Sequence, residues 1–232
     1  MALFLKAAAV PAHDIPLNAF LQQVFACSAE TAASIGRRAA VRGWPARTMI
    51  LQQGEHAGST YLVVVGRAQA LVYGLEGQMV LLHEFAPGDF FGAIAVARPE
   101  PEDADVVAVE DVRAAVFGGT DFLDLIEAHG CVGLAVSRVL LRQLRAASSR
   151  MAERTTLSAA GRVHAELLRL ARLGDGRTIR PAPVLAALAV RVHSTRETVS
   201  RTISALERRG VIRREADALV IVAPRRLEEM VV

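Results

Sequence analysis

The spacing of apolar residues changes near Asp121, and this change restricts the chain to folds that combine a β-rich part with a helical part. Between about Ile50 and Phe117, short apolar and β-branched runs are separated by glycines, which is typical of strands joined by tight turns. In TYLVVVGRAQALVYGLEGQMVLLHEF, the sequence GLEG at positions 74–77 divides two such runs and predicts a hairpin. After Asp121, apolar residues recur at every third or fourth position, as they do in helices. The sequence therefore predicts an α+β protein whose first part is a small barrel or sandwich.

A long helix is predicted from about Cys131 to Arg154. Its apolar positions lie near one stripe, with arginines elsewhere: Val136, Val139, Leu140, Leu144, Ala147 and Met151. Such a stripe packs either against the helix's own domain or against a partner helix, and the spacing alone does not decide between the two.

The residues from position 158 onward have the order of elements of a winged helix-turn-helix. Ser158 is a suitable N-cap for a helix, and Gly210 is suitable just after the end of one. The predicted elements are a helix over 158–171, a loop over 173–183, a helix over 184–190, a tight turn over 191–194, a helix over 195–209, two strands over 211–222 and a short helix from Pro224. In this motif the second helix enters the major groove of DNA.

Charge is distributed unevenly along the chain. The net charge is only +3, but residues 1–125 carry 8 basic and 14 acidic side chains, whereas residues 126–232 carry 19 basic and 10 acidic ones. A basic C-terminal part is typical of a protein that binds a polyanion such as DNA. No apolar run reaches the roughly 18–20 residues that cross a bilayer, and no signal peptide is recognisable. We therefore expect a cytoplasmic protein with no membrane partner.

The start of the helix predicted at 195–209 has the chemistry of a surface that reads DNA bases. The residues expected to bind DNA are Thr195, Arg196, Glu197, Thr198, Ser200 and Arg201. Arginine pairs with O6 and N7 of guanine, glutamate accepts from N4 of cytosine, and hydroxyls suit phosphate contacts. On the opposite side, Val199, Ile203 and Leu206 would hold the helix to its own core. A solvated salt-bridge face is the alternative interpretation, but the winged-helix pattern and the basic charge favour DNA.

The stretch TRETVSRTISALERRGVI, residues 195–212, resembles the recognition helix of the CRP/FNR family of bacterial transcription regulators. The resemblance extends over about residues 15–230 and includes Gly54-Glu55, Gly66 and the sequence PGDFFG at 87–92. It implies an N-terminal β-roll of the cyclic-nucleotide-binding type (a jelly roll), a long dimerisation helix and a C-terminal winged helix-turn-helix. The corresponding segments are residues 1–125, 126–157 and 158–232.

By this resemblance the protein would be a homodimer that binds a palindromic DNA site and contacts RNA polymerase, and it would not be an enzyme. Arg196, Glu197 and Arg201 would read each half-site, and the stripe of the long helix would form the dimer interface. The arginine and glutamate positions resemble readers of TGTGA-like half-sites. The subset Glu197, Ser200 and Arg201 equally resembles readers of TTGAT-like half-sites, so both stay open.

The residues after PGDFFG depart from those of family members that bind cyclic AMP. Such members supply a glutamate for the ribose and an Arg-Ser or Arg-Thr pair for the phosphate. Ungapped alignment places Ala93, Asp103 and Ala104 there, in an acidic loop, RPEPEDAD, that begins at Arg98 and would repel a phosphate. The altered pocket positions are Gly92, Ala93, Asp103, Ala104 and Ser148. We therefore expect no cyclic AMP in the usual mode, and leave open another effector or none.

Other sensing chemistries have weaker support in the sequence. Iron–sulfur members of the family use four cysteines, whereas this chain has two, Cys27 and Cys131, which are either redox-active or small buried fillers. His83, beside Leu82, is a candidate haem ligand, although an ordinary hydrogen-bonded histidine is the simpler interpretation. The alternatives to a DNA-binding regulator with an unknown effector are a haem-dependent gas or redox sensor of the same family and an interaction module without a DNA target.

Overall fold

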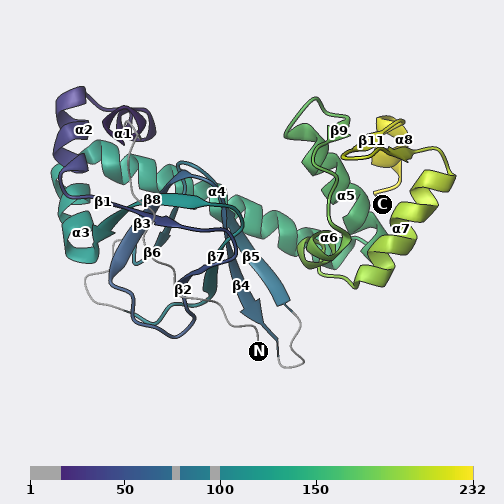
Figure 1. Cartoon of the computed structure of the whole chain (residues 1–232), viewed down its shortest axis with the longest axis horizontal. Helices are drawn as coiled ribbons and strands as arrows, with labels where there is room; N and C mark the ends of the chain where they lie inside the picture. Colours follow the sequence, from purple (N-terminus) through teal and green to yellow (C-terminus); the bar gives the residue numbers. More distant parts are fainter. Residues whose placement is uncertain (1–16, 75–78, 95–99, 232) are drawn as a thin grey trace. The chain divides into compact units, whose positions relative to one another are not determined.

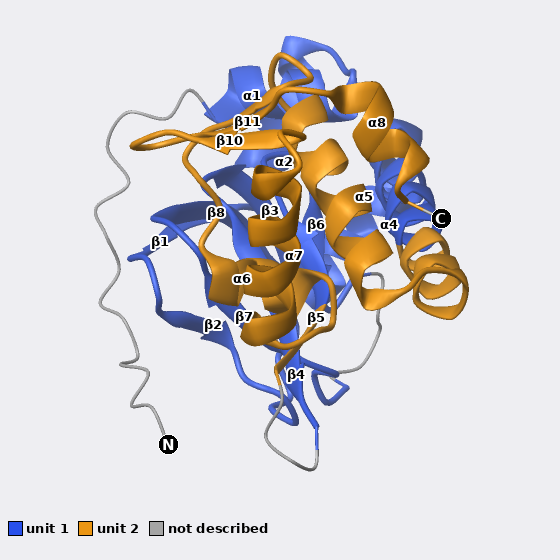
Figure 2. Cartoon of the chain, turned by 90° about the vertical axis from the view of Figure 1, so that its right-hand side faces the viewer, with its two compact units in different colours: residues 1–77, 82–146 blue, residues 78–81, 147–232 orange. Residues whose placement is uncertain are grey.

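The computed structural model describes residues 17–74, 79–94 and 100–231, and the chain divides into two compact units (Figures 1 and 2). One unit comprises residues 1–77 and 82–146, and the other comprises residues 78–81 and 147–232. Most of the predicted GLEG turn and Arg98 of the acidic loop lie outside the described residues.

The N-terminal unit contains two four-stranded sheets, which confirms the predicted roll. One sheet has the order β1 (Ala40–Trp44), β8 (Val112–Gly118), β3 (Ser59–Val65) and β6 (Phe90–Gly92). The other has the order β2 (Met49–Leu51), β7 (Asp105–Ala108), β4 (Ala68–Tyr73) and β5 (Met79–Phe85). The strand pairs with described registers are antiparallel.

Alternate residues of β3 enter two different cores, as the two-residue repeat of a strand requires. Tyr61 and Val63 belong to the core that includes residues of both sheets, where the rings of Tyr61 and Phe91 stack with centroids 4.9 Å apart. Leu62 and Val64 belong to a second core, which is shared with helices. The central sheet is therefore buried on both faces, which explains why its strands are almost continuously apolar.

Four helices supply the other side of the second core (Figure 1). They are α1 (Leu17–Phe25), α2 (Ala29–Gly36), α3 (Gly119–Ala128) and the first half of α4 (Gly130–Thr156). The sequence analysis did not identify α1, α2 or β1. Val136 and Val139 of α4 are 6% and 3% exposed in this core. The expectation that these two side chains form an open dimer stripe is therefore corrected, because their own domain buries them.

The C-terminal unit has the predicted winged helix-turn-helix order. Its elements are α5 (Ala159–Arg172), β9 (Thr178–Ile179), α6 (Leu185–Arg191), α7 (Arg196–Arg208), β10 (Ile212–Arg214), β11 (Leu219–Ile221) and α8 (Pro224–Glu229). The three strands form one sheet in the order β10-β11-β9. The predicted loop at 173–183 therefore includes a short strand, because β9 pairs with β11, with Ile179 opposite Leu219. None of the described helices combines the length and apolarity needed to cross a membrane.

Two glycines of the roll allow a test of how tightly its turns are packed. Gly66 and Gly54 have nearly equal positive φ angles of 82° and 81°. A Cβ at Gly66 would lie 2.2 Å from the carbonyl oxygen of Asp111, whereas one at Gly54 would have no neighbour within 4 Å. We expect Gly54→Ala to cost about 1–2 kcal/mol through backbone strain alone, and Gly66→Ala to cost clearly more because the backbone of Asp111 must move.

Urea unfolding followed by the fluorescence of Trp44, the only tryptophan in the chain, measures this difference within the roll. Equal losses of stability in the two variants would mean that Asp111 yields freely and that the turn is not held by close packing.

Candidate DNA interface

Helix α7 presents a polar face because its other face is buried. Val199, Ile203 and Leu206 are 0–1% exposed and belong to the core of the C-terminal unit. Arg196 and Arg201 are exposed on the surface of the same helix. The apolar side therefore fixes the rotation of α7, as the sequence predicted.

The N-terminus of α7 is capped by a side chain. Thr195 precedes the helix in an extended conformation, and its Oγ1 accepts a hydrogen bond from the Thr198 backbone N–H at 3.1 Å. Thr195 and Glu197 are exposed, whereas Thr198 and Ser200 are half-buried. The structure thus brings all six predicted DNA-binding residues to the first two turns of one helix.

The acidic and basic residues at the start of α7 are not consumed by ion pairs. Within the described part of the chain, Arg196 and Glu197 make no salt bridge, and Arg201 reaches only the Thr198 hydroxyl, at 3.5 Å. Elsewhere in the unit, Arg169 pairs with Glu166 at 2.7 Å. A salt-bridged surface face would have paired these charges, so their open state supports a surface kept for a ligand.

The turn between α6 and α7 is held by Arg162, a residue that the sequence analysis missed. Its guanidinium donates from Nε to the carbonyl oxygen of Val192 at 2.9 Å, from Nη1 to that of Leu157 at 3.0 Å and from Nη2 to that of His193 at 3.3 Å. These acceptors are backbone atoms, up to 31 positions away in the chain, and have no sequence signature. Arg162 therefore fixes the turn that orients α7.

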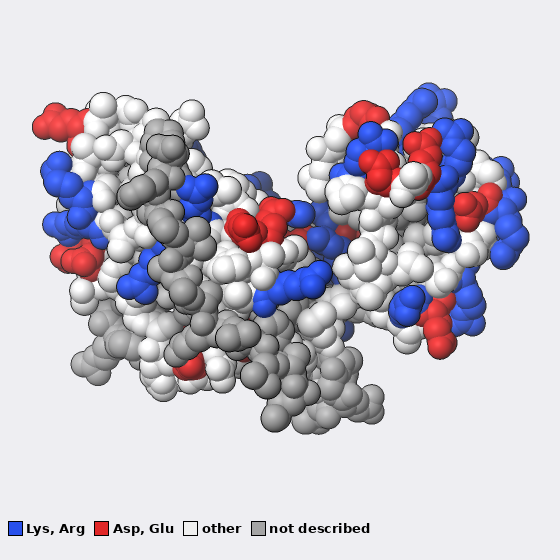
Figure 3. Space-filling view, viewed as in Figure 1, with Lys and Arg blue, Asp and Glu red and all other residues white. Residues whose placement is uncertain are grey.

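His193 occupies the turn in a left-handed conformation, with a φ of 48°. Histidine is among the residues that tolerate this region. Burial lowers the pKa of His193, and the charges of Arg154, Arg162 and Arg150 lower it further. The imidazole is therefore held neutral within a cluster of arginines. Figure 3 shows basic side chains widely distributed over the C-terminal unit, on the right of the view.

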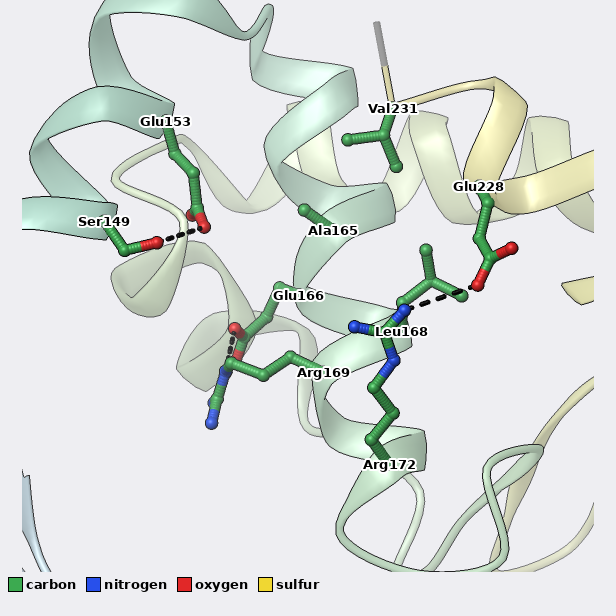
Figure 4. Close-up of a pocket in the computed structure, with 9 residues that line it drawn as sticks. All are labelled: Ser149, Glu153, Ala165, Glu166, Leu168, Arg169, Arg172, Glu228 and Val231. Atoms are coloured by element: carbon green, nitrogen blue, oxygen red, sulfur yellow. Dashed lines mark hydrogen bonds and ion pairs between the residues drawn. The ribbon is translucent and has the colours of Figure 1, made fainter. Parts of the chain in front are cut away.

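A separate pocket of the C-terminal unit is lined by opposite charges that already pair (Figure 4). It is formed by Ser149, Glu153, Ala165, Glu166, Leu168, Arg169, Arg172, Glu228 and Val231. Glu166 accepts two hydrogen bonds of 2.7 Å from Arg169, and Arg172 donates to Glu228 at 3.3 Å. Since both arginines are neutralised, the pocket is not prepared for an anionic effector.

The pocket positions of the roll carry no cationic group. Ala93 and Ala104 are 9% and 8% exposed, and the Ala93 carbonyl oxygen accepts a hydrogen bond from Thr60 at 2.8 Å. Gly92 has a φ of 83°, and Asp103 is exposed. Burial raises the pKa of the Glu102 carboxyl, and Asp103 raises it further, so the two carboxylates repel each other. The last predicted position, Ser148, is exposed on α4.

The candidate haem ligand lies against an aromatic ring. His83 is half-buried on β5, with its ring centroid 4.8 Å from that of Phe85. Among the described residues, no group of three or more histidine, cysteine, aspartate or glutamate side chains could hold a metal ion.

The second half of α4 exposes large apolar side chains. From the predicted stripe, Leu140, Leu144 and Met151 are 44%, 64% and 71% exposed, and Ala147 is also exposed. Leu134 and Leu141 are exposed as well, on a face that the sequence analysis missed. A continuous apolar surface of this kind on a helix is typical of a protein–protein contact.

Comparisons with known proteins agree with both units. Residues 41–129 match the cyclic nucleotide-binding domain, and residues 161–230 match the Crp-like helix-turn-helix domain. The chain is 34% identical over 173 residues to the cyclic AMP receptor protein of Thermus thermophilus, which covers 74% of this chain and 79% of that protein.

Solved structures share the fold. A CooA mutant from Carboxydothermus hydrogenoformans has a TM-score of 0.77 at 16% identity, covering 91% of this chain and 95% of that one. The c-di-GMP responsive global regulator CLP of Xanthomonas campestris has a TM-score of 0.74 at 17% identity, covering 84% and 99%.

The lowered pKa of His193 leads to a prediction about pH. In the folded state His193 binds a proton more weakly than in the unfolded chain, so acidification through its ordinary pKa of 6.5 favours unfolding. We expect His193→Asn, which keeps a residue that tolerates positive φ, to reduce the loss of thermal stability of the C-terminal unit between about pH 7.5 and 5.5. Far-UV circular dichroism on heating measures it, and an unchanged loss would show that other groups titrate.

Proposed function

Because the chain belongs to the CRP/FNR family of transcription regulators, we propose that it acts as a homodimer that binds a palindromic DNA site through the two copies of α7. The observation that carries this proposal is the open, unpaired polar face formed by Arg196, Glu197 and Arg201 on a helix whose other face is locked in a core. Contact with RNA polymerase would follow the mode of the family.

The chemistry of α7 supports reading of guanine and cytosine. Arg196 and Arg201 would each donate to O6 and N7 of a guanine, and Glu197 would accept from N4 of a cytosine. Thr195 and Thr198 lie at the helix N-terminus, where hydroxyls and backbone N–H groups suit phosphates. These groups fit TGTGA-like and TTGAT-like half-sites. Selection from random oligonucleotides distinguishes them, and recovery of no DNA would support an interaction module instead.

Dimerisation is supported by the exposed apolar residues of α4. Leu140, Leu144 and Met151 are three to four turns of helix surface with no partner in their own chain that buries them. Pairing of two copies of α4 would remove this surface from water and place two α7 helices for one palindrome.

The effector would differ from cyclic AMP in its usual mode. The cyclic AMP receptor protein of Thermus thermophilus is named for that ligand, but here Asp103 and Ala104 stand where binders have an arginine and a hydroxyl. Calorimetric titration with cyclic AMP, cyclic GMP and cyclic di-GMP tests this part. Saturable binding of cyclic AMP would contradict it, whereas no binding of any nucleotide together with a selected palindrome would indicate DNA binding without them.

Arg201→Ala is the sharpest test of base reading. Loss of a bidentate contact should weaken binding to the selected site by about 1–3 kcal/mol and relax the preference at one G·C pair in each half-site. Arg208→Ala, at the exposed C-terminal end of the same helix, removes the same charge and serves as the control. We expect it to weaken all DNA alike and to keep the sequence preference. Equal preference in both variants would remove Arg201 from the reading face.

Leu144→Glu tests the proposed dimer. A carboxylate at this 64% exposed position would be buried without a partner at a helix pair, so we expect a monomer with much weaker binding to the palindrome. Ser149→Glu, an exposed position on a different face of α4, controls for the added charge and should stay dimeric. Light scattering and DNA titration measure both, and a dimeric Leu144→Glu protein would move the interface elsewhere.

A further inference from the structure

The two cysteines of the chain come together in the fold. Cys27 follows α1, and Cys131 lies in the first turn of α4, about 100 residues later. Both thiols are free and half-buried, and both pack against the core that α1, α2, α3 and α4 share. A side-chain hydrogen bond joins the two thiols.

The surrounding contacts place the same two segments side by side. Val24, one turn before Cys27, and Ala135, one turn after Cys131, line a common pocket. Phe25 and Val132, the nearest core residues on each side, are 2% and 0% exposed in the same cluster. Because these apolar neighbours are fixed, the thiols are held together by the packing of the roll and not by a flexible loop.

We propose that Cys27 and Cys131 form a reversible intramolecular disulfide when the protein meets a peroxide, so that this corner of the N-terminal unit is a redox-sensitive modification site. The inference does not depend on DNA binding.

The chemistry balances with hydrogen peroxide as the oxidant. One thiol sulfur attacks the O–O bond, which breaks to give a sulfenic acid and one water. The second thiol attacks the sulfenic sulfur, the S–O bond breaks, and a second water leaves as the S–S bond forms. Two thiols are oxidised and one peroxide is reduced. A dithiol reductant reverses the reaction by thiol–disulfide exchange.

The environment of the pair sets the pace of this reaction. Burial raises the pKa of the Cys27 thiol, and the adjacent Cys131 raises it further. Since the thiolate is the nucleophile, this keeps the thiol protonated and the reaction slow at neutral pH. The protein should therefore be exposed to sustained peroxide and not to a brief pulse.

The test treats the folded full-length chain with hydrogen peroxide, blocks the remaining thiols with N-ethylmaleimide and measures the intact mass. We expect a mass lower by two hydrogen atoms, no maleimide adduct, and a peptide map that links Cys27 to Cys131, all reversed by dithiothreitol. Sulfinic acid at either cysteine, a disulfide between two chains, or two maleimide adducts after oxidation of exposed methionines has begun would overturn the proposal.

Two controls separate proximity from simple reactivity. In urea, the same oxidation should give several-fold less intramolecular disulfide, because an unfolded loop of about 100 residues keeps the thiols apart. In Cys131→Ser, Cys27 has no resolving thiol, so its sulfenic acid should persist and be labelled by dimedone. An equal yield of disulfide in the folded and unfolded chains would show that the fold does not promote the bond.

Discussion

The burial of one side of α7 is the constraint on which the DNA-facing surface depends. Val199, Ile203 and Leu206 are almost fully buried in the core of the C-terminal unit. Removing each such side chain from water contributes about 1.5–3 kcal/mol, so turning the helix by half a rotation would cost several kcal/mol. Arg196 and Arg201 therefore face outward without any ligand, and their desolvation is the main electrostatic cost that remains for binding.

The turn before α7 carries this orientation into the rest of the unit. Arg162 ties three backbone carbonyl oxygens of two different segments to α5, while His193 supplies the left-handed backbone that the tight turn needs. Arg150 and Arg154 lie close enough to disfavour a proton on His193. The positive charge behind the turn thus comes from guanidinium groups that stay ionised, so the attraction for a polyanion does not depend on the histidine.

Local patterns were predictable from the sequence, and long-range neighbours were not. The face of α7 follows from the spacing of Val199, Ile203 and Leu206, which is set within four turns of one helix. The apolar stripe of α4 looks the same whether it meets its own domain or a partner, so the burial of Val136 could not be separated from the exposure of Leu144. The pairing of Cys27 with Cys131 arises only when α1 and α4 pack on one core, and no spacing rule describes it.

The uneven charge of the chain gives the two units different behaviour toward DNA. The first 125 residues carry six more acidic than basic side chains, and the remainder carries nine more basic than acidic ones. A polyanion attracts the second part and repels the first, so approach with α7 foremost is favoured before any base is touched. The same acidic excess reaches the roll's pocket, where Asp103 is exposed and raises the pKa of Glu102. An anionic effector in that pocket would have to overcome this repulsion, whereas the DNA surface has no comparable barrier.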